Sequence, residues 1–429
     1  MLHYLLDYLY RIIPTLDNVF ARLFNYLSIR SALALLISLL ITVYFGKTII
    51  KFLSKKLVED QIRDLGLKGQ VEKRGTPTMG GVIILLGVLI PTLLLCQLDN
   101  IYVIILLITI IWLGFIGFID DYIKVFKNNK KGLAGKFKII GQCGLGLIVA
   151  SILFFHPGVI IQENINDKEI AELISNQKNH PDSLEKDIIA FQRDSRNFFG
   201  DSLYHSLKTT IPFFKNNQLD YKELIPDSLQ NPWVIFMVFS FIIIFIITAV
   251  SNSANLTDGI DGLATGSSAI IGATLGVFCY ISGNMVAADY LDIMYISDIG
   301  ELVVLLSAFV GACVGFLWYN SYPAQVFMGD TGSLALGGII GVVAVLIRKE
   351  LLIPIFCGIF FIESLSVILQ VSYFKFTKYK FGVGRRIFLM SPLHHHYQKK
   401  GIHESKIVTR FWIVCVFLCV LAFVTLKLR

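Results

Sequence analysis

Residues 101–127 read IYVIILLITIIWLGFIGFIDDYIKVFK, in which an apolar run over 101–119 ends directly on two aspartates. The hydrocarbon core of a bilayer is about 30 Å thick, so a helix needs about 20 apolar residues to cross it. The run lacks the alternation of apolar and polar residues that marks a strand of a membrane barrel. Because lipid offers no partners to backbone groups, this stretch predicts a transmembrane α-helix.

The composition of the whole chain points the same way. Of the 429 residues, 55% are hydrophobic and 16% are charged, whereas soluble proteins carry about 25% charged residues. We therefore expect an all-α, polytopic integral membrane protein. Apolar runs predict ten transmembrane helices, near residues 29–50, 77–97, 101–119, 137–155, 233–250, 262–282, 299–319, 331–347, 351–373 and 407–427.

Lysine and arginine gather in the loops after the first, third and ninth predicted helices. The positive-inside rule places these loops in the cytoplasm and both termini outside it. The net charge of +7 forms no basic domain with interleaved aromatic residues, which excludes nucleic acid as a partner. All seven cysteines lie in or beside apolar runs and indicate buried free thiols.

The predicted helices divide the chain into four parts. Residues 1–28 lack the basic start and cleavage site of a signal peptide and are expected to form an interfacial amphipathic segment. Helices one to four occupy 29–155, and helices five to ten with cytoplasmic catalytic loops occupy 233–429. Residues 156–232 are polar and net acidic, and parity predicts an extracytoplasmic insertion. A loosely ordered elaboration without chemistry is the simpler interpretation of their composition.

The aspartates at the end of the third helix are the first candidates for chemistry. Asp120 and Asp121 are adjacent, and Lys124 follows one turn later. Adjacent carboxylates repel each other, so each favours a cation or a shared proton, and Mg²⁺ prefers carboxylates together with phosphate oxygens. A solvated helix end, with an ion pair from Asp120 to Lys124, is the structural alternative.

Two further acidic clusters follow the fifth and seventh helices. SNSANLTDGIDGLATG (251–266) places Asp258 and Asp261 on one helical face, beside glycines that let a ligand approach the backbone. FMGDTGSLALGG (327–338) places Asp330 at the start of the eighth helix. A helix N-cap would explain Asp330, or one of the other two aspartates, but not all three.

Two more motifs complete the set. KRGTPTMGG (73–81) brings a lysine, hydroxyls and a glycine pair to a helix N-terminus, an arrangement that suits the binding of a phosphate. On physical grounds alone, a transmembrane helix packed through its glycines is the stronger interpretation. SPLHHHYQKKG (391–401) brings three histidines that are poorly arranged for one zinc ion and better suited to contact phosphate or sugar. All five motifs follow odd-numbered helices, so they are expected on one membrane face. Independent helix caps would not segregate in this way.

These five motifs, in this order and over nearly the whole chain, resemble the phospho-N-acetylmuramoyl-pentapeptide transferases of bacteria. The resemblance implies transfer of phospho-MurNAc-pentapeptide from UDP-MurNAc-pentapeptide to undecaprenyl phosphate, giving lipid I and UMP, with Mg²⁺ as cofactor. It also implies the bacterial inner membrane, with catalysis on its cytoplasmic face. A monomer and a homodimer both stay open. The 156–232 insertion departs from the family's usual short connection.

The resemblance assigns roles residue by residue. Asp330 resembles the family's metal-binding aspartate, and Asp120 and Asp121 resemble its catalytic pair and are further candidate metal ligands. His394 belongs to the essential histidine loop and is a catalytic candidate with them. The positions that resemble substrate-binding residues are Lys73, Thr78, Lys124, Lys136, Asn255, Asp258, Gly259, Ile260, Asp261, Asn320, Phe327, His395 and His396. Glu363 and Gln370 in the ninth helix either line a lipid groove or form hydrogen bonds between helices.

Several alternatives stay open at this point. Asp120 could take the proton from, or orient, the lipid phosphate in one step, or an aspartate could first carry the phospho-sugar covalently. Relatives that load N-acetylglucosamine phosphate onto the same lipid are set apart by GTPTMGG and the triple histidine. A cation transporter also needs intramembrane carboxylates, but near the midplane instead of at helix ends.

Overall fold

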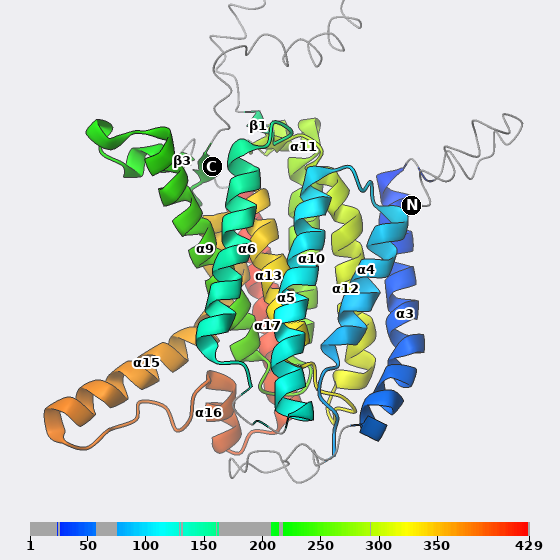
Figure 1. Ribbon diagram of the computed structural model, residues 1–429, viewed down its shortest axis with the longest axis vertical. Helices are drawn as coiled ribbons and strands as arrows, with labels where there is room; N and C mark the ends of the chain where they lie inside the picture. Colours follow the sequence, from blue (N-terminus) through cyan, green and yellow to red (C-terminus); the bar gives the residue numbers. More distant parts are fainter. Residues whose placement is uncertain are drawn as a thin grey trace, which may run out of the picture.

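The computed structural model describes residues 24, 26–56, 75–127, 129, 132–159, 161–162, 207–213, 218–291 and 293–427. Figure 1 shows a bundle of long helices that run along the longest axis of the molecule, with one helix, α15, leaving it at an angle. The long or apolar helices of the bundle are α3 (Leu27–Lys56), α4 (Gly81–Leu95), α5 (Ile101–Phe126), α6 (Gly135–Phe155), α9 (Pro232–Thr257), α10 (Leu263–Ser282), α12 (Leu302–Asn320), α13 (Gly329–Leu346), α15 (Gly358–Phe381) and α17 (Glu404–Lys427).

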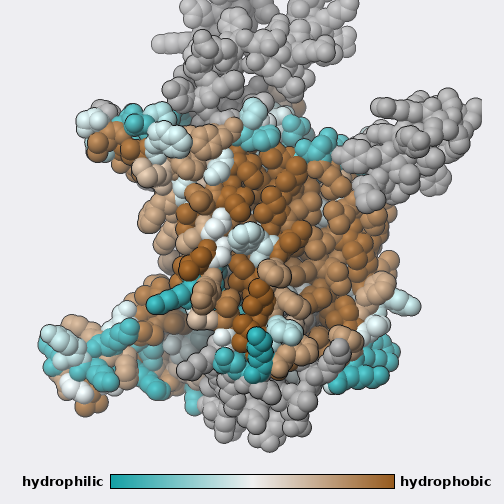
Figure 2. Space-filling view, viewed as in Figure 1, coloured by the Kyte–Doolittle hydropathy of each residue, from teal (hydrophilic) through white to brown (hydrophobic). Residues whose placement is uncertain are grey.

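The expected all-α membrane fold is confirmed. Within the described residues, nine helices are long and apolar enough to cross a membrane. The second predicted helix is present as α4, which has 15 residues because the chain before Gly81 is not helical. Figure 2 shows the outward side chains as a broad hydrophobic surface between two more polar ends. The protein is therefore a multi-pass membrane protein.

Helix α13 forms the centre of the bundle, packed against α5, α9, α10 and α4. In its most apolar window, 94% of the residues are buried inside the protein. Its glycines allow the close approach: a Cβ on Gly338 would lie 2.0 Å from Leu113 Cδ1 of α5. Since small residues at a helix interface are what tight packing in lipid requires, the GSLALGG sequence explains why α13 is central.

The loops after the even-numbered helices gather at one end of the bundle. Strand β1 (Ile161–Gln162) pairs with β4 (Tyr295–Ile296), and Asn100 Nδ2 donates to the carbonyl of Asp298 at 2.8 Å. Thr210, in β2 (Lys208–Thr210), donates its N–H to the carbonyl of Arg348 at 3.4 Å. The segregation of loops that parity predicted is thereby present in the structure.

The N-terminal end of α3 and the C-terminal end of α17 lie at the same end of the bundle as these loops. Arg30 of α3 forms an ion pair with Glu301 at 2.5 Å, and the rings of Phe423 of α17 and Phe278 of α10 are 4.8 Å apart. Glu301 belongs to the short helix η4 (Ile299–Glu301), which follows β4. The expectation that the chain enters and leaves the bundle on one side is consistent with these contacts.

Parts of the insertion and of the N-terminal segment lie outside the described residues, among them 1–23, 163–206 and Lys73. The described part of the insertion contains β2 paired with β3 (Gln218–Asp220), followed by the short helices η2 (Tyr221–Leu224) and η3 (Asp227–Leu229). The remaining short elements are α11 (Met285–Tyr290), η5 (Glu350–Leu352), α14 (Ile353–Phe356) and α16 (Leu393–Lys399). Of these, α16 carries the triple histidine to the opposite end of the bundle (Figure 1).

Candidate active site

Three carboxylates converge at the end of the bundle opposite the insertion. Asp120 and Asp121 come from the last turns of α5, and Asp330 comes from the first turn of α13. One ligand oxygen from each lies within 4.8 Å of the others. Asp120 is fully buried, Asp121 is 3% exposed, and the side chain of Asp330 keeps 13% of its surface. The sequence motifs predicted this gathering.

Two lysines stand between these carboxylates. Lys124 pairs with Asp120 and lies 3.0 Å from Asp330 Oδ2. Lys138, from the first turns of α6, lies 3.0 Å from Asp120 Oδ1 and also pairs with Asp330. The carboxylates are thus arranged around positive charge, which offsets the repulsion between their own charges.

Asp121 joins α5 to α13. Its two oxygens accept hydrogen bonds from the N–H of Asp330 at 3.1 Å, the N–H of Thr331 at 2.9 Å and Thr331 Oγ1 at 2.6 Å. Gly329, at φ +74°, allows this, because a Cβ there would lie 2.6 Å from Asp121 Oδ2. Asp121 therefore satisfies the free N–H groups of the α13 N-terminus from another helix.

The 255–262 segment lies against the same cluster. Asn255 Nδ2 donates to Asp330 Oδ1 at 3.1 Å, and Asp258 caps the end of α9. Burial, followed by repulsion from Asp330, Asp121 and Asp261, raises the pKa of Asp258 to about 8. The raised pKa of Asp258 therefore reflects burial beside three other carboxylates.

Asp261 and Asn320 hold the loops around the site. Asp261 Oδ2 accepts from the N–H of Ala324 at 3.0 Å, and its own N–H donates to Glu404 Oε1 at 2.7 Å. Asn320 Oδ1 accepts from the N–H of Gly262 at 3.2 Å, and its Nδ2 donates to the carbonyl of Val326 at 3.0 Å. Both were predicted as substrate-binding residues, and both are buried supports of the loops in this structure.

The glycine pair of the GTPTMGG motif packs against the start of α13. The N–H groups of Gly80 and Gly81 donate to the carbonyls of Phe327 and Met328 at 2.8 Å each. A Cβ on Gly81 would lie 2.1 Å from the backbone nitrogen of Gly332. These two N–H groups are therefore occupied, and the packing interpretation holds for the pair. Thr78 keeps part of its side chain exposed beside them.

The triple histidine contributes one fully buried ring. His394 Nδ1 lies 3.2 Å from Glu363 Oε2 of α15, and the His394 N–H donates to Glu363 Oε1 at 3.2 Å. Its Nε2 faces Gly259, where a Cβ would lie only 2.2 Å away. Glycine at 259 is thus what allows the histidine helix to approach the 255–262 segment.

Other predicted site residues contact groups other than the three carboxylates. Ile260 packs in a small apolar cluster with Leu263, Ile407 and Val408. Lys136 is exposed, and no contact of its side chain with the carboxylates is found in the described part of the chain. His395 Nδ1 is 2.7 Å from Gln398 Oε1. His396 Nδ1 accepts from the N–H of Leu389 at 3.1 Å, and burial together with Lys400 lowers the pKa of His396.

The chemistry of the donor set fits Mg²⁺. Carboxylate oxygens are its preferred protein ligands, and one or two of them suffice when phosphate oxygens complete the shell. Asp120 Oδ2 is buried without a hydrogen-bond donor in the described residues, apart from its ion pair with Lys124. Asp330 and Asp120 are the residues that would hold the ion.

Comparison with known proteins decides the family. The model of a family described as Glycosyl transferase family 4 matches residues 199–348, and the phospho-N-acetylmuramoyl-pentapeptide-transferase signature 1 matches residues 73–85. The chain is 57% identical to the phospho-N-acetylmuramoyl-pentapeptide-transferase of Flavobacterium psychrophilum over 433 residues, 100% of both chains. It is 53% identical to that of Flavobacterium johnsoniae and 51% identical to that of Parabacteroides distasonis, again over 100% of both.

The chain belongs to the phospho-N-acetylmuramoyl-pentapeptide-transferase family. The resemblance that the motifs carried is confirmed, and the chain is a phospho-sugar transferase. Because these relatives of the transferase family match over their full length, the 156–232 segment has a counterpart in them.

One residue of this transferase site was missed from the sequence, and the partner of a second could not be predicted. Lys138 contacts both Asp120 and Asp330, and its only signal was a second lysine in GKFK, two positions after Lys136. Glu363 was noted only as a hydrogen-bonding residue or a groove residue of the ninth helix. Its pairing with His394 could not be read from a separation of 31 residues.

Proposed function

We propose that this chain transfers phospho-MurNAc-pentapeptide from UDP-MurNAc-pentapeptide to undecaprenyl phosphate, giving lipid I and UMP. The reaction takes place at the cytoplasmic face of the bacterial inner membrane, uses Mg²⁺, and is the first membrane step of peptidoglycan synthesis. The cytoplasmic assignment is supported by the basic loops that share an end with the carboxylates. Full-length similarity to transferases of this name supports the choice of sugar.

One observation carries the proposal: Asp120, Asp121 and Asp330 meet beside Lys124 and Lys138 at one end of the bundle. The physical task is to bring a lipid phosphate against an anionic pyrophosphate. A site at the membrane surface lets a soluble nucleotide and a lipid head group meet. Lysines at that surface screen the repulsion between the two substrates.

The hydrogen bonds support a division of labour among the aspartates. Both oxygens of Asp121 are occupied by Asp330 and Thr331, so Asp121 positions the start of α13. Asp330 lies between Asn255 and the two lysines, which suits a metal ligand on the pyrophosphate. Asp120 Oδ2 has the Lys124 ammonium as its one partner among the described residues, which suits the group that meets the lipid phosphate.

In the one-step reaction, an oxygen of the lipid phosphate forms a bond to the β-phosphorus of the nucleotide sugar. The bond from that phosphorus to the bridging oxygen breaks, and UMP leaves with the electron pair. Asp120 accepts the proton of a monoprotonated lipid phosphate, or orients its dianion. Lys124 and Lys138 stabilise the charge that develops on the leaving UMP. Mg²⁺, when bound, would neutralise charge on the pyrophosphate.

A two-step reaction uses the same residues, with an aspartate oxygen attacking the β-phosphorus first and the lipid phosphate displacing it afterwards. Stereochemistry separates the two. A substrate chiral at the β-phosphorus gives an inverted product after one displacement and a retained product after two. We favour the single displacement, because the oxygens of Asp121 are occupied and those of Asp120 and Asp330 face lysines.

The closest rival is transfer of N-acetylglucosamine phosphate to the same lipid. Full-length protein in bilayers containing undecaprenyl phosphate should release UMP from UDP-MurNAc-pentapeptide and not from UDP-N-acetylglucosamine. The reverse preference would replace the proposed sugar. Cation flux without UMP release would replace the proposed reaction class with transport.

A further inference from the structure

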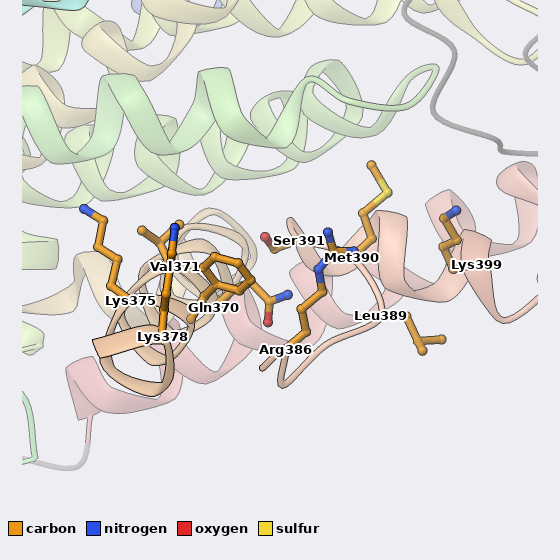
Figure 3. A pocket seen from close by; sticks show the side chains of 10 residues that line it. Gln370, Val371, Lys375, Lys378, Arg386, Leu389, Met390, Ser391 and Lys399 are labelled. Carbon is orange, nitrogen blue, oxygen red and sulfur yellow. The ribbon is translucent and has the colours of Figure 1, made fainter. Parts of the chain in front are cut away.

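An open groove lies between the last turns of α15 and the chain that returns to α16. Its volume is about 890 Å³. Figure 3 shows the side chains that line it from both walls, with Lys375 at one end and Lys399 at the other. Lys375 and Lys378 come from α15, Arg386 comes from the returning chain, and Lys399 comes from α16.

The groove combines positive charge with an apolar floor. None of its ten lining residues is acidic. In the described part of the chain its four cations form no ion pair with a carboxylate. Apolar contact comes from Val371, Phe374, Leu389 and Met390. This combination fits an amphiphilic anion, with the charged part beside the cations and an alkyl chain against the floor.

The groove is built into the fold. Val371, Phe374, Lys375 and Lys378 have the spacing of one helix face, so α15 presents a stripe toward the returning chain. Gln370, at the base, accepts from the N–H groups of Ile387 and Phe388 at 3.0 Å each and donates to the carbonyl of Phe388 at 3.1 Å. These bonds hold the second wall against α15.

The position of the groove indicates which anionic molecule binds in it. Helix α15 leaves the bundle at the end where the carboxylates lie (Figure 1). Around the groove it exposes large apolar side chains, with Phe376 57% and Phe381 53% exposed, and Val383, just beyond its end, is 69% exposed. A helix with such a surface lies in lipid at the level of the head groups. The molecules present there at high concentration are the phospholipids of that leaflet.

We propose that this groove binds the anionic head group of a bilayer phospholipid that is not a substrate. The phosphate carries one negative charge, which reduces the repulsion among the cations of the groove, and it bridges α15 to the chain that carries α16. Because α16 places His394 on Gly259, an anionic lipid stabilises the arrangement of the histidine helix beside the carboxylates. Lipid binding itself does not depend on the proposed substrates.

Lipid retention by the full-length protein tests the groove directly. Protein equilibrated in bilayers of equal phosphatidylglycerol and phosphatidylcholine is purified, and the lipid retained is measured by native mass spectrometry. The comparison is between wild type, K375Q/K378Q and K380Q. Lys380 is the matched control, because it is exposed on the same helix turn but lies near the rings of Phe376 and Phe381, outside the groove.

Wild type should retain phosphatidylglycerol in preference to phosphatidylcholine. One basic residue near an anionic head group is worth about a fivefold gain in binding, so K375Q/K378Q should retain about 25-fold less. K380Q should stay within about twofold of wild type. Equal retention of both lipids, or equal loss in K380Q and K375Q/K378Q, would overturn the proposal.

Two further arms separate the outcomes. Saturating undecaprenyl phosphate should leave phosphatidylglycerol bound; one-for-one displacement would assign the groove to the acceptor and overturn the proposal. Transfer by wild type should rise when phosphatidylglycerol replaces phosphatidylcholine, and K375Q/K378Q should lose that rise while keeping the rate that wild type has in phosphatidylcholine. A rise of equal size in the double variant would contradict the proposed link to α16.

Discussion

Lys138 of α6 pairs with Asp330 of α13, across 192 residues of sequence. The same ammonium group lies 3.0 Å from Asp120 of α5, so three helices meet at one charge. This contact links the metal-ligand candidate to the residue proposed to meet the lipid phosphate. It also explains how the carboxylates of Asp120 and Asp330 can lie so close together.

Replacement of Lys138 by alanine is expected to reduce transfer by about 100-fold, the usual effect of removing one charge-stabilising group from an active site. Lys136→Ala is the matched control, because that lysine is exposed two positions earlier on the same helix. UMP release at saturating substrate measures both. A larger loss in Lys136→Ala than in Lys138→Ala would reverse the assignment and restore the sequence-based choice.

The two adjacent aspartates are expected to differ in what they support. Asp121→Asn should lower the free energy of unfolding by about 1–3 kcal/mol, because it weakens hydrogen bonds that hold the α13 N-terminus. Asp120→Asn should abolish transfer with little change in stability, because Lys124 and Lys138 keep Asp330 as a partner. Thermal unfolding in detergent together with UMP release separates these effects. Equal destabilisation by both variants would argue against the division.

Much of this arrangement could be predicted from the sequence. The apolar run before Asp120 is long enough to predict a transmembrane helix. Because the acidic motifs all follow odd-numbered helices, the sequence also predicts that they lie at one end of the bundle. The partners could not be predicted. Whether Lys136 or Lys138 points at the carboxylates depends on the rotation of α6, which an apolar run does not define. The pairing of Glu363 with His394 depends on the angle at which α15 leaves the bundle.

The contact between Gly259 and His394 gives a steric prediction. Gly259→Ala would place a Cβ 2.2 Å from His394 Nε2 and displace the ring. If the expected catalytic role of His394 holds, a shift of this size costs about 100-fold in rate. Gly276→Ala is the control, because its Cβ would meet Leu306 Cβ at an ordinary 3.7 Å. In a His394→Ala background, Gly259→Ala should reduce the transfer rate much less. An equal reduction in that background would show that Gly259→Ala does not act through the His394 ring.

The raised pKa of Asp258 gives a pH prediction for protein kept in EDTA. Its pKa of about 8 lies above the ordinary value of 3.8, so the folded state holds a proton that the unfolded state releases. Stability should therefore fall as pH rises from about 4 to about 8. Asp258→Asn should flatten this part of the curve of melting temperature against pH. A wild-type curve that rises over the same range would contradict the assignment.

The most direct test of the central claim is UMP release from UDP-MurNAc-pentapeptide by purified protein in bilayers that contain undecaprenyl phosphate and Mg²⁺. Wild type should release UMP only when both are present, and Asp330→Ala, folded and in the membrane, should release none. Near-normal release by Asp330→Ala, or wild-type release that persists without Mg²⁺, would contradict the account of the carboxylate cluster.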